Sequence, residues 1–246
     1  MLMLKKINIA FLLLLLSVQM FAQQQVKSSV AGADFMRINE AYSNSKKLKM
    51  NIGYVLYASY TSTIPSENAK GVFMKQNNST YSELLGFTSL NNNKVSLSVD
   101  QNEQTIIVTD PPSKTVIPGA VDFDTLLKIC SSITYKELDG NIKLYKLRFD
   151  NVVSSQYNAI DIYFNGETFL LTRLSLYFRE EADLNENDNI HVKEKPRLEI
   201  SYTSIETSPV FEPGQFSEAR YINVTGKKIT CASAYKAFHL INHKLS

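Results

Sequence analysis

Residues 70–87 read KGVFMKQNNSTYSELLGF, and this stretch decides how the rest of the chain is interpreted. Two segments that contain apolar and aromatic residues flank a polar run at residues 75–80. Short segments of this kind on either side of a polar turn are typical of a β-hairpin. The sequence then raises a question: such strands surround either a packed core or a space kept open for a ligand.

Strand-like segments recur on both sides of this hairpin. Val95, Leu97 and Val99 alternate with serines, which is the period of two expected for a strand. The dipeptides Asp139-Gly140 and Asn165-Gly166 are strong signals for hairpin turns. We expect loops at residues 61–69 and 180–194, and either final strands or a short helix at 219–224 and 228–243. The expected strands are residues 50–60, 71–76, 79–87, 94–100, 104–109, 133–138, 142–149, 158–164, 168–179 and 197–202.

Two segments instead have a helical period. Phe35, Ile38 and Tyr42 recur at spacings of three and four and predict a helix over residues 30–47. A second helix is expected over residues 121–131. A sheet of about eleven strands curls, splits or closes. The predicted fold class is therefore mainly β: an unclosed antiparallel β-barrel with helices covering one mouth, in a single domain from residue 23 to 246 with a C-terminal extension from about residue 225.

The first 22 residues resemble a secretory signal peptide. Lys5 and Lys6 precede the apolar run of residues 9–16, and Ala22 ends the segment before three glutamines. No cysteine stands near this point, so no lipobox is expected. The sequence predicts an exported, soluble protein of the periplasm, with cleavage after Ala22.

Charge and composition exclude some partners. Removing residues 1–22 removes two lysines and no acid, so the formal net charge falls from +2 to 0. Nucleic-acid binding depends on many cationic contacts with phosphate, so we do not expect it. The neutral composition also predicts no electrostatic attraction to anionic membranes. We expect no stable membrane insertion, and we expect a monomer.

The chain has two cysteines, Cys130 and Cys231. Export to an oxidising compartment makes a disulfide between them one alternative, and two separate buried thiols are the other. The sequence leaves both open.

Two motifs that suggest catalysis or metal binding have simpler interpretations. Asp122 and Asp124 resemble a phosphotransfer motif, but they follow a Pro-Gly pair and begin a predicted helix, which favours helix capping. His239 and His243 are four residues apart, a spacing that suits a metal on a helix, yet no acid or cysteine lies at a fitting local spacing. We therefore predict no enzyme activity, no catalytic residue, no metal site and no cofactor.

Several predicted strands are apolar or aromatic on both faces. Tyr54 and Leu56 share one face of the first strand, while Val55 and Tyr57 lie on the other. Either helices cover one face and tyrosines line the other, or the strands enclose an apolar cavity. The pattern alone does not decide between the two.

The order of these features resembles the LolA-like periplasmic carriers of outer-membrane lipoproteins. The similarity rests on the first helix, on Gly71-Val72-Phe73-Met74-Lys75, and on the strand that ends at Asp110-Pro111. A second helix at residues 123–130, the two hairpin signals and a late strand at residues 198–202 follow in the same order. The resemblance covers most of residues 30–220.

This resemblance implies an unclosed barrel with a helical lid over a cavity that shields acyl chains. Each methylene withdrawn from water is worth about 0.8 kcal/mol, so an acyl chain that crosses an aqueous space gains from such a sleeve. The carriers have a tryptophan and then Lys-Arg-Pro in the strand that begins with the glycine. Here Phe73-Met74-Lys75-Gln76-Asn77 stands in that place, with Lys75 as the nearest cation.

The resulting hypothesis is a non-catalytic carrier or chaperone for lipid or lipoprotein acyl chains. The alternative is a non-enzymatic envelope module that uses the same fold to bind or sense a protein partner through an exposed patch, most plausibly on the tyrosine-rich faces. The carrier predicts a continuous apolar cavity, which a filled interior would contradict. Its expected lining residues are Tyr54, Leu56, Phe73, Leu85, Leu97, Ile106, Phe123 and Leu127.

Overall fold

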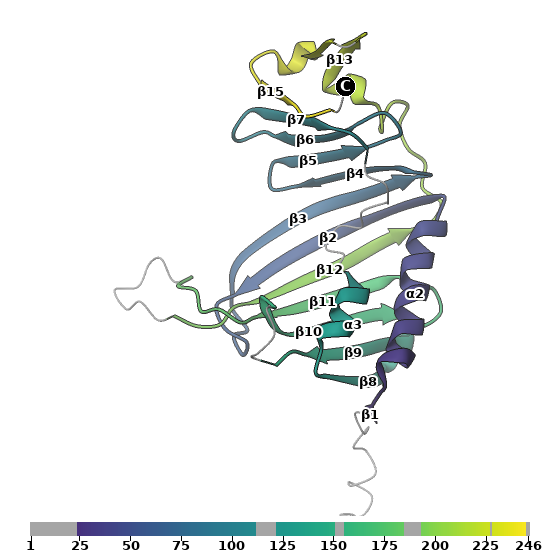
Figure 1. Ribbon diagram of the computed structural model, residues 1–246, viewed down its shortest axis with the longest axis vertical. Coiled ribbons are helices and arrows are strands. Elements are labelled where there is room, and N and C mark those ends of the chain that lie inside the picture. Colours follow the sequence, from purple (N-terminus) through teal and green to yellow (C-terminus); the bar gives the residue numbers. More distant parts are fainter. Residues whose placement is uncertain (1–23, 112–121, 151–154, 185–192, 227, 245–246) are drawn as a thin grey trace, which may run out of the picture.

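The computed structural model describes residues 24–111, 122–150, 155–184, 193–226 and 228–244. In these residues one 13-stranded sheet dominates, with the strand order β1-β8-β9-β10-β11-β12-β2-β3-β4-β5-β6-β7-β15 (Figure 1). Neighbouring strands are antiparallel, except that β15 runs parallel to β7. The edge strands β1 and β15 lie at opposite ends of this order, so the sheet is unclosed.

The strands have the following bounds: β1 Gln24–Gln25, β2 Lys47–Tyr57, β3 Pro65–Gln76, β4 Ser79–Leu84, β5 Phe87–Asn91, β6 Ser96–Asp100, β7 Thr105–Thr109, β8 Ser132–Leu138, β9 Ile142–Arg148, β10 Tyr157–Asn165, β11 Leu171–Phe178, β12 Arg197–Glu206, β13 Ile222–Thr225, β14 Lys228–Cys231 and β15 His239–Asn242. The α-helices are α2 Ser28–Asn44 and α3 Phe123–Ile129. Three 3₁₀ turns complete the elements: η2 Asp139–Asn141, η3 Glu218–Arg220 and η4 Ser233–Tyr235.

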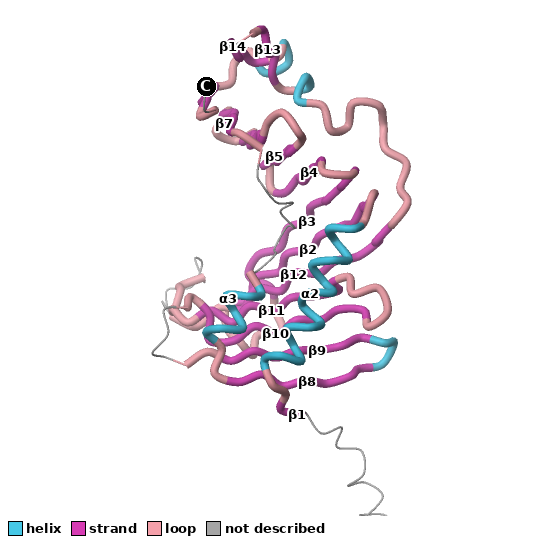
Figure 2. Tube along the Cα trace, turned by 45° about the vertical axis from the view of Figure 1, so that its right-hand side comes forward, coloured by secondary structure: helices cyan, strands magenta, loops and turns pink. Residues whose placement is uncertain are grey.

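Both helices pack on the same face of the sheet, which we call the helix-side face (Figure 2). Phe35 of α2 stacks on Phe123 of α3 with ring centroids 4.7 Å apart. Phe35 also meets Tyr145 of β9 edge-on at 5.3 Å. The helical spacing seen in the sequence is therefore the stripe that fixes α2 to the sheet.

Alternation along the strands assigns side chains to the two faces. On β2, Leu48, Met50 and Ile52 are almost fully buried and point to the helix-side face. Their neighbours Lys49 and Asn51 point to the opposite face, which we call the outer face. Because paired residues of neighbouring strands point to the same face, the assignment extends across the whole sheet.

The sheet is covered on different faces in its two halves. A first hydrophobic cluster lies between the helices and the helix-side face of β8–β12, β2 and β3. A second cluster lies on the outer face of β4–β7, where Leu90, Leu97 and Val108 meet Tyr221 and Ile222 of the C-terminal segment. Figure 1 shows this segment, β13 to β15, at the end of the molecule beyond β7. The chain after β12 therefore completes the half of the sheet that the helices do not reach.

In the described residues most of the expected elements are present, with two corrections. The predicted signal peptide of residues 1–22 and part of the loop expected at 180–194 lie outside the described residues. The expected loop at residues 61–69 is wrong in part, because β3 begins at Pro65 and pairs along the whole of β2. Proline is tolerated as the first residue of a strand. The expected strand at residues 79–87 is two strands, β4 and β5, joined by Leu85 and Gly86 with φ of 52° and 82°. The unclosed, mainly antiparallel sheet with two helices on one face agrees with the LolA-like fold that the resemblance implied.

Candidate functional site

The space beneath α2 is filled by large side chains. Tyr42, Tyr145, Phe35, Phe73 and Phe164 each have under 2% of their surface exposed. Close packing of this kind leaves little room for a ligand between α2 and the sheet. A binding site on the helix-side face therefore has to lie at the border of this cluster.

Such a border exists at the far end of β2. Lys75, which contacts the end of α2, pairs with Leu48 on β2. Leu56 lies eight positions further along β2, about 27 Å away at the rise of a strand. Half-buried apolar side chains lie on the helix-side face near this end of β2, and others lie on α3, at the border of the first cluster. We call this group the open margin; it consists of Tyr54, Leu56, Leu127, Ile129, Tyr157 and Leu198.

The strand register holds the sheet part of the open margin together. Leu56 pairs with Leu198 of β12, and Leu198 pairs in turn with Leu176 of β11. Tyr157 lies beside Phe178 with ring centroids 5.4 Å apart. Burial raises the pKa of Tyr54, so its phenol stays uncharged well above neutral pH. The open margin is thus an apolar, uncharged surface that solvent reaches in part.

The structure divides the eight residues expected to line a cavity. Phe73 and Phe123 are buried in the first cluster, and Tyr54, Leu56 and Leu127 belong to the open margin. Leu97 and Ile106 are buried on the outer face, against the C-terminal segment. Leu85 is 66% exposed in the turn between β4 and β5. Because the set occupies opposite faces of the sheet and a turn, it does not line one continuous surface.

Polar contacts around the apolar cluster fix α2 to the sheet. Tyr145 donates a hydrogen bond to Asp34 of α2 at 3.0 Å, and Lys143 lies 3.7 Å from the same carboxylate. The backbone N–H of Leu171 donates to the Tyr42 hydroxyl at 3.2 Å. Burial raises the pKa of Tyr42 and Tyr145. These contacts bind α2, whereas α3 is a short helix whose stability comes from its packing.

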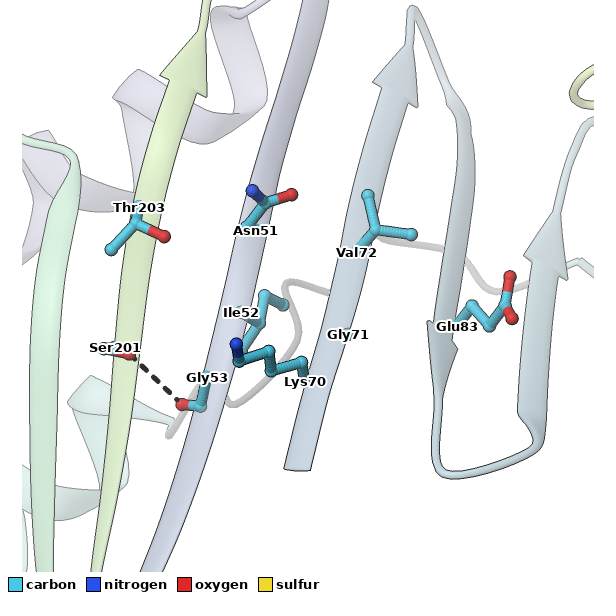
Figure 3. A pocket seen from close by; sticks show the side chains of 9 residues that line it. All are labelled: Asn51, Ile52, Gly53, Lys70, Gly71, Val72, Glu83, Ser201 and Thr203. Carbon is cyan, nitrogen blue, oxygen red and sulfur yellow. Dashed lines mark hydrogen bonds between the residues drawn. The ribbon is translucent and has the colours of Figure 1, made fainter. Parts of the chain in front are cut away.

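A second candidate lies on the outer face, as a hollow of about 570 Å³ (Figure 3). Gly53 forms its floor, and a Cβ atom at this position would meet Ser201 Oγ at 2.6 Å. Lys70 and Glu83 are the charged residues at its border. This hollow was not predicted from the sequence, because its residues are distant in the chain and Gly53 alone is a weak signal. The lining residues are Asn51, Ile52, Gly53, Lys70, Gly71, Val72, Glu83, Ser201 and Thr203.

The two cysteines are free thiols in the structure. Cys130 packs against the cluster beneath the helices, and Cys231 packs against the cluster on the outer face. Of the two alternatives that the sequence left open, the structure therefore has two separate, partly buried thiols.

The two motifs that suggested chemistry have structural positions. Asp122 accepts hydrogen bonds from the Thr125 backbone N–H at 3.2 Å and from the Thr125 hydroxyl at 2.6 Å, as an N-cap of α3 does. The Thr125 hydrogen bonds lower the pKa of Asp122. His239 lies in β15 and His243 follows it, so their four-residue spacing does not fall on a helix.

Comparisons with known proteins give matches among solved structures only. No protein-family model matches the chain, and no curated protein matches its sequence. An uncharacterised conserved protein of Thermus thermophilus is 8% identical over 87% of this chain and 99% of its own, with a TM-score of 0.44. A LolA superfamily protein of Nitrosomonas europaea is 11% identical over 73% and 94%, with a TM-score of 0.32.

A putative outer-membrane lipoprotein-sorting protein domain of Vibrio parahaemolyticus is 8% identical over 78% of this chain and 96% of its own, with a TM-score of 0.33. At such identities and TM-scores we draw no functional inference from these likenesses. Within the described part of the chain, none of the helices is long and apolar enough to cross a membrane.

Proposed function

We propose that this protein is a non-catalytic, exported carrier or chaperone that binds the acyl chain of a lipid or lipoprotein at the open margin. The observation that supports the proposal is the row of half-buried apolar side chains at the end of the helix-covered sheet. Leu56 and Leu198 form its sheet side, and Leu127 lies on α3. Exposing an acyl chain costs about 0.8 kcal/mol per methylene, so covering part of the chain against this apolar surface favours binding.

In this proposal α3 is the element that moves. It has seven residues, and Phe123 and Leu126 are its buried anchors. A helix this short is not stable alone, so its position depends on what it packs against. An acyl chain inserted at the open margin replaces part of that packing, with Phe123 and Leu126 then contacting the ligand. The space beneath α2 is filled, so the continuous apolar cavity expected from the sequence is wrong. The proposal instead requires only the surface of the open margin and a movement of α3.

The test is binding of a fluorescent long-chain fatty acid and of an acylated peptide. We expect binding by the unaltered protein and a loss of about tenfold or more in the double variant Leu56→Asp/Leu198→Asp, since tenfold corresponds to 1.4 kcal/mol. The matched control is Val210→Asp/Val224→Asp, which alters two exposed valines, 94% and 51% accessible. Equal losses in both variants, or no binding by the unaltered protein, would contradict the proposal.

The alternative of a protein-binding envelope module is favoured by a separate observation. Three large apolar residues in this half of the sheet are exposed: Leu85 in the turn between β4 and β5, Phe87 of β5 and Ile107 of β7. Phe87 and Ile107 point to the helix-side face, in the half that the helices leave uncovered. Exposed apolar residues that gather in this way mark protein interaction sites. Under this alternative Phe87→Ser removes partner capture and leaves fatty-acid binding unchanged.

A further inference from the structure

The outer face of β8–β12 has an excess of positive charge. The strand register places five cationic side chains there and three carboxylates. The near-neutral composition of the chain hides this excess, because the residues come from five strands that are far apart in sequence. The cationic residues are Lys136, Lys146, Arg148, Arg173 and Arg197, and the acidic ones are Asp161, Glu199 and Glu206.

Ion pairs neutralise only part of this face. Asp161, which is 2% exposed, accepts from Arg148 at 3.0 Å and lies 3.9 Å from Lys146. Glu199 lies 3.3 Å from Arg197 Nε. Glu206 lies 3.8 Å from Lys49 of the adjacent strand β2. Each carboxylate balances one charge, so with Lys49 included the cations of this face exceed the carboxylates by three. A face that is partly neutralised in this way still has a positive potential near its surface.

Tyrosines lie among these cations. The Arg173 guanidinium lies 3.9 Å from the centroid of the Tyr163 ring, and that of Arg197 lies 4.2 Å from the ring of Tyr57. Tyr177 is close to Asp161, with its hydroxyl donating at 3.3 Å. Such stacking holds guanidinium groups against the sheet. The Arg197 guanidinium also donates to the backbone carbonyls of Tyr60 and Ser62.

Among the described residues, no helix or other strand covers this face, and the loop at Tyr60 packs on its border at Tyr177 and Arg197. The helices pack on the opposite side of the same strands, and the C-terminal segment packs further along, on β4–β7. Five adjacent strands give the face a width of about 20 Å at the usual spacing of 4.8 Å. The face is therefore broad, cationic and aromatic, and it is available to a partner.

We propose that this face docks the protein on the surface of a bilayer that contains anionic phospholipids. Anionic headgroups attract cations near the surface, and tyrosine is suited to the depth of the headgroups. A nucleic acid is less suited, because specific complexes use more phosphate contacts and a groove-reading element. The docking surface lies on the side of the sheet opposite the open margin. Docking and acyl binding are therefore separate properties that can be lost one at a time.

The test is co-sedimentation of the exported protein with phosphatidylglycerol-containing vesicles and with pure phosphatidylcholine vesicles. We expect binding to the anionic vesicles alone and its loss at 1 M salt, where the screening length is about 3 Å. Lys136→Gln/Arg173→Gln should weaken the binding about 25-fold, at about fivefold per charge. The matched control Lys228→Gln/Lys236→Gln removes two exposed charges from the C-terminal segment and should change little.

Three results would overturn docking: no binding to anionic vesicles, binding that salt does not weaken, or equal losses in the two double variants. If polyglutamate competes for the face and binds more tightly than the vesicles, the partner is an acidic protein and the bilayer is wrong. If the Lys136/Arg173 variant does not fold, the salt dependence of the unaltered protein still decides the matter. Fatty-acid binding is unchanged in all these variants if the acyl site is separate.

Discussion

Lys75 is a charged residue that the fold buries almost completely, with 2% of its surface exposed. Its ammonium group donates to the backbone carbonyl of Ser43 at 3.2 Å and to that of Ser45. These carbonyls lie at the end of α2, where helix carbonyls lack backbone partners and the helix dipole favours a cation. Burial lowers the pKa of Lys75. Lys75 is the cation closest in sequence to the position at which the LolA-like carriers have an arginine. In this structure it joins β3 to the end of α2.

Replacing Lys75 by methionine keeps the volume and removes the donor. We expect Lys75→Met to lower the free energy of unfolding by about 1–3 kcal/mol, because buried carbonyl groups lose their partner. Urea denaturation measures the change, with the exposed Lys228→Met as the control. A Lys75 variant as stable as the control would show that these hydrogen bonds make no net contribution to the free energy of unfolding.

Gly53 has a different role at the residue scale, because it leaves room for a neighbour. A Cβ atom there would lie 2.6 Å from Ser201 Oγ, closer than unbonded atoms approach. We expect Gly53→Ala to destabilise the protein by about 1–3 kcal/mol through overpacking. Adding Ser201→Ala, which removes that oxygen, should restore most of the loss in a double-mutant cycle. If the two changes are simply additive, the close approach is not the cause.

At the scale of elements, the C-terminal segment acts as a cover. Tyr221 and Ile222 are 4% and 1% exposed and pack on apolar side chains of β4–β7. β15 then continues the sheet beside β7, through pairs such as Leu240 with Ile106. An edge strand that is paired in this way no longer offers a free row of backbone groups.

This role predicts the effect of shortening one buried side chain of the C-terminal segment. Ile222→Ala should cost about 2–4 kcal/mol, because it leaves a cavity in the second cluster. Fatty-acid binding at the open margin should not change, since the open margin lies on the other face. Thermal or urea unfolding measures the first effect and a fluorescence titration the second. A loss of fatty-acid binding in a folded Ile222→Ala protein would contradict the separation of the two halves.

Local sequence patterns predicted the helices and strands, but they did not predict which segment covers each face of the sheet. Phe35, Ile38 and Tyr42 identified α2, and the alternation of Val95, Leu97 and Val99 identified buried positions. Alternation tells which residues share a face, but it does not tell what covers that face. Leu97 was therefore expected beside Phe73, yet helices cover one and the C-terminal segment covers the other. The hollow at Gly53 and the cationic outer face depend on strand register, which local sequence does not specify.

At the scale of the whole molecule, buried tyrosines make stability depend on alkaline pH. Tyr42 and Tyr202 are 1% and 3% exposed, and burial raises the pKa of both. Their pKa values in the folded protein are above the unfolded value of 10.0. The stability that they contribute is therefore complete below pH 10 and is lost as the pH rises toward the folded values.

We expect the free energy of unfolding to fall above about pH 10, by up to about 1.4 kcal/mol per pH unit for each tyrosine that stays protonated. Urea unfolding at pH 8 and at pH 11 measures the difference. The absorbance of phenolate, recorded on the folded protein, should show a group of tyrosines that do not ionise near pH 10. Tyr42→Phe should reduce the slope. If every tyrosine of the folded protein ionises near pH 10, the prediction fails.

The whole molecule is an unclosed sheet with three separate surfaces: a helix-covered apolar side with an open margin, a cationic outer face and a half completed by the C-terminal segment. The central claim is that the open margin binds the acyl chain. Photo-crosslinking with a diazirine fatty acid, followed by mass-spectrometric mapping, tests it most directly. We predict labels on peptides that contain Tyr54, Leu56, Leu127 and Leu198. Labels concentrated at Leu85 and Phe87, or spread evenly over the surface, would contradict the claim.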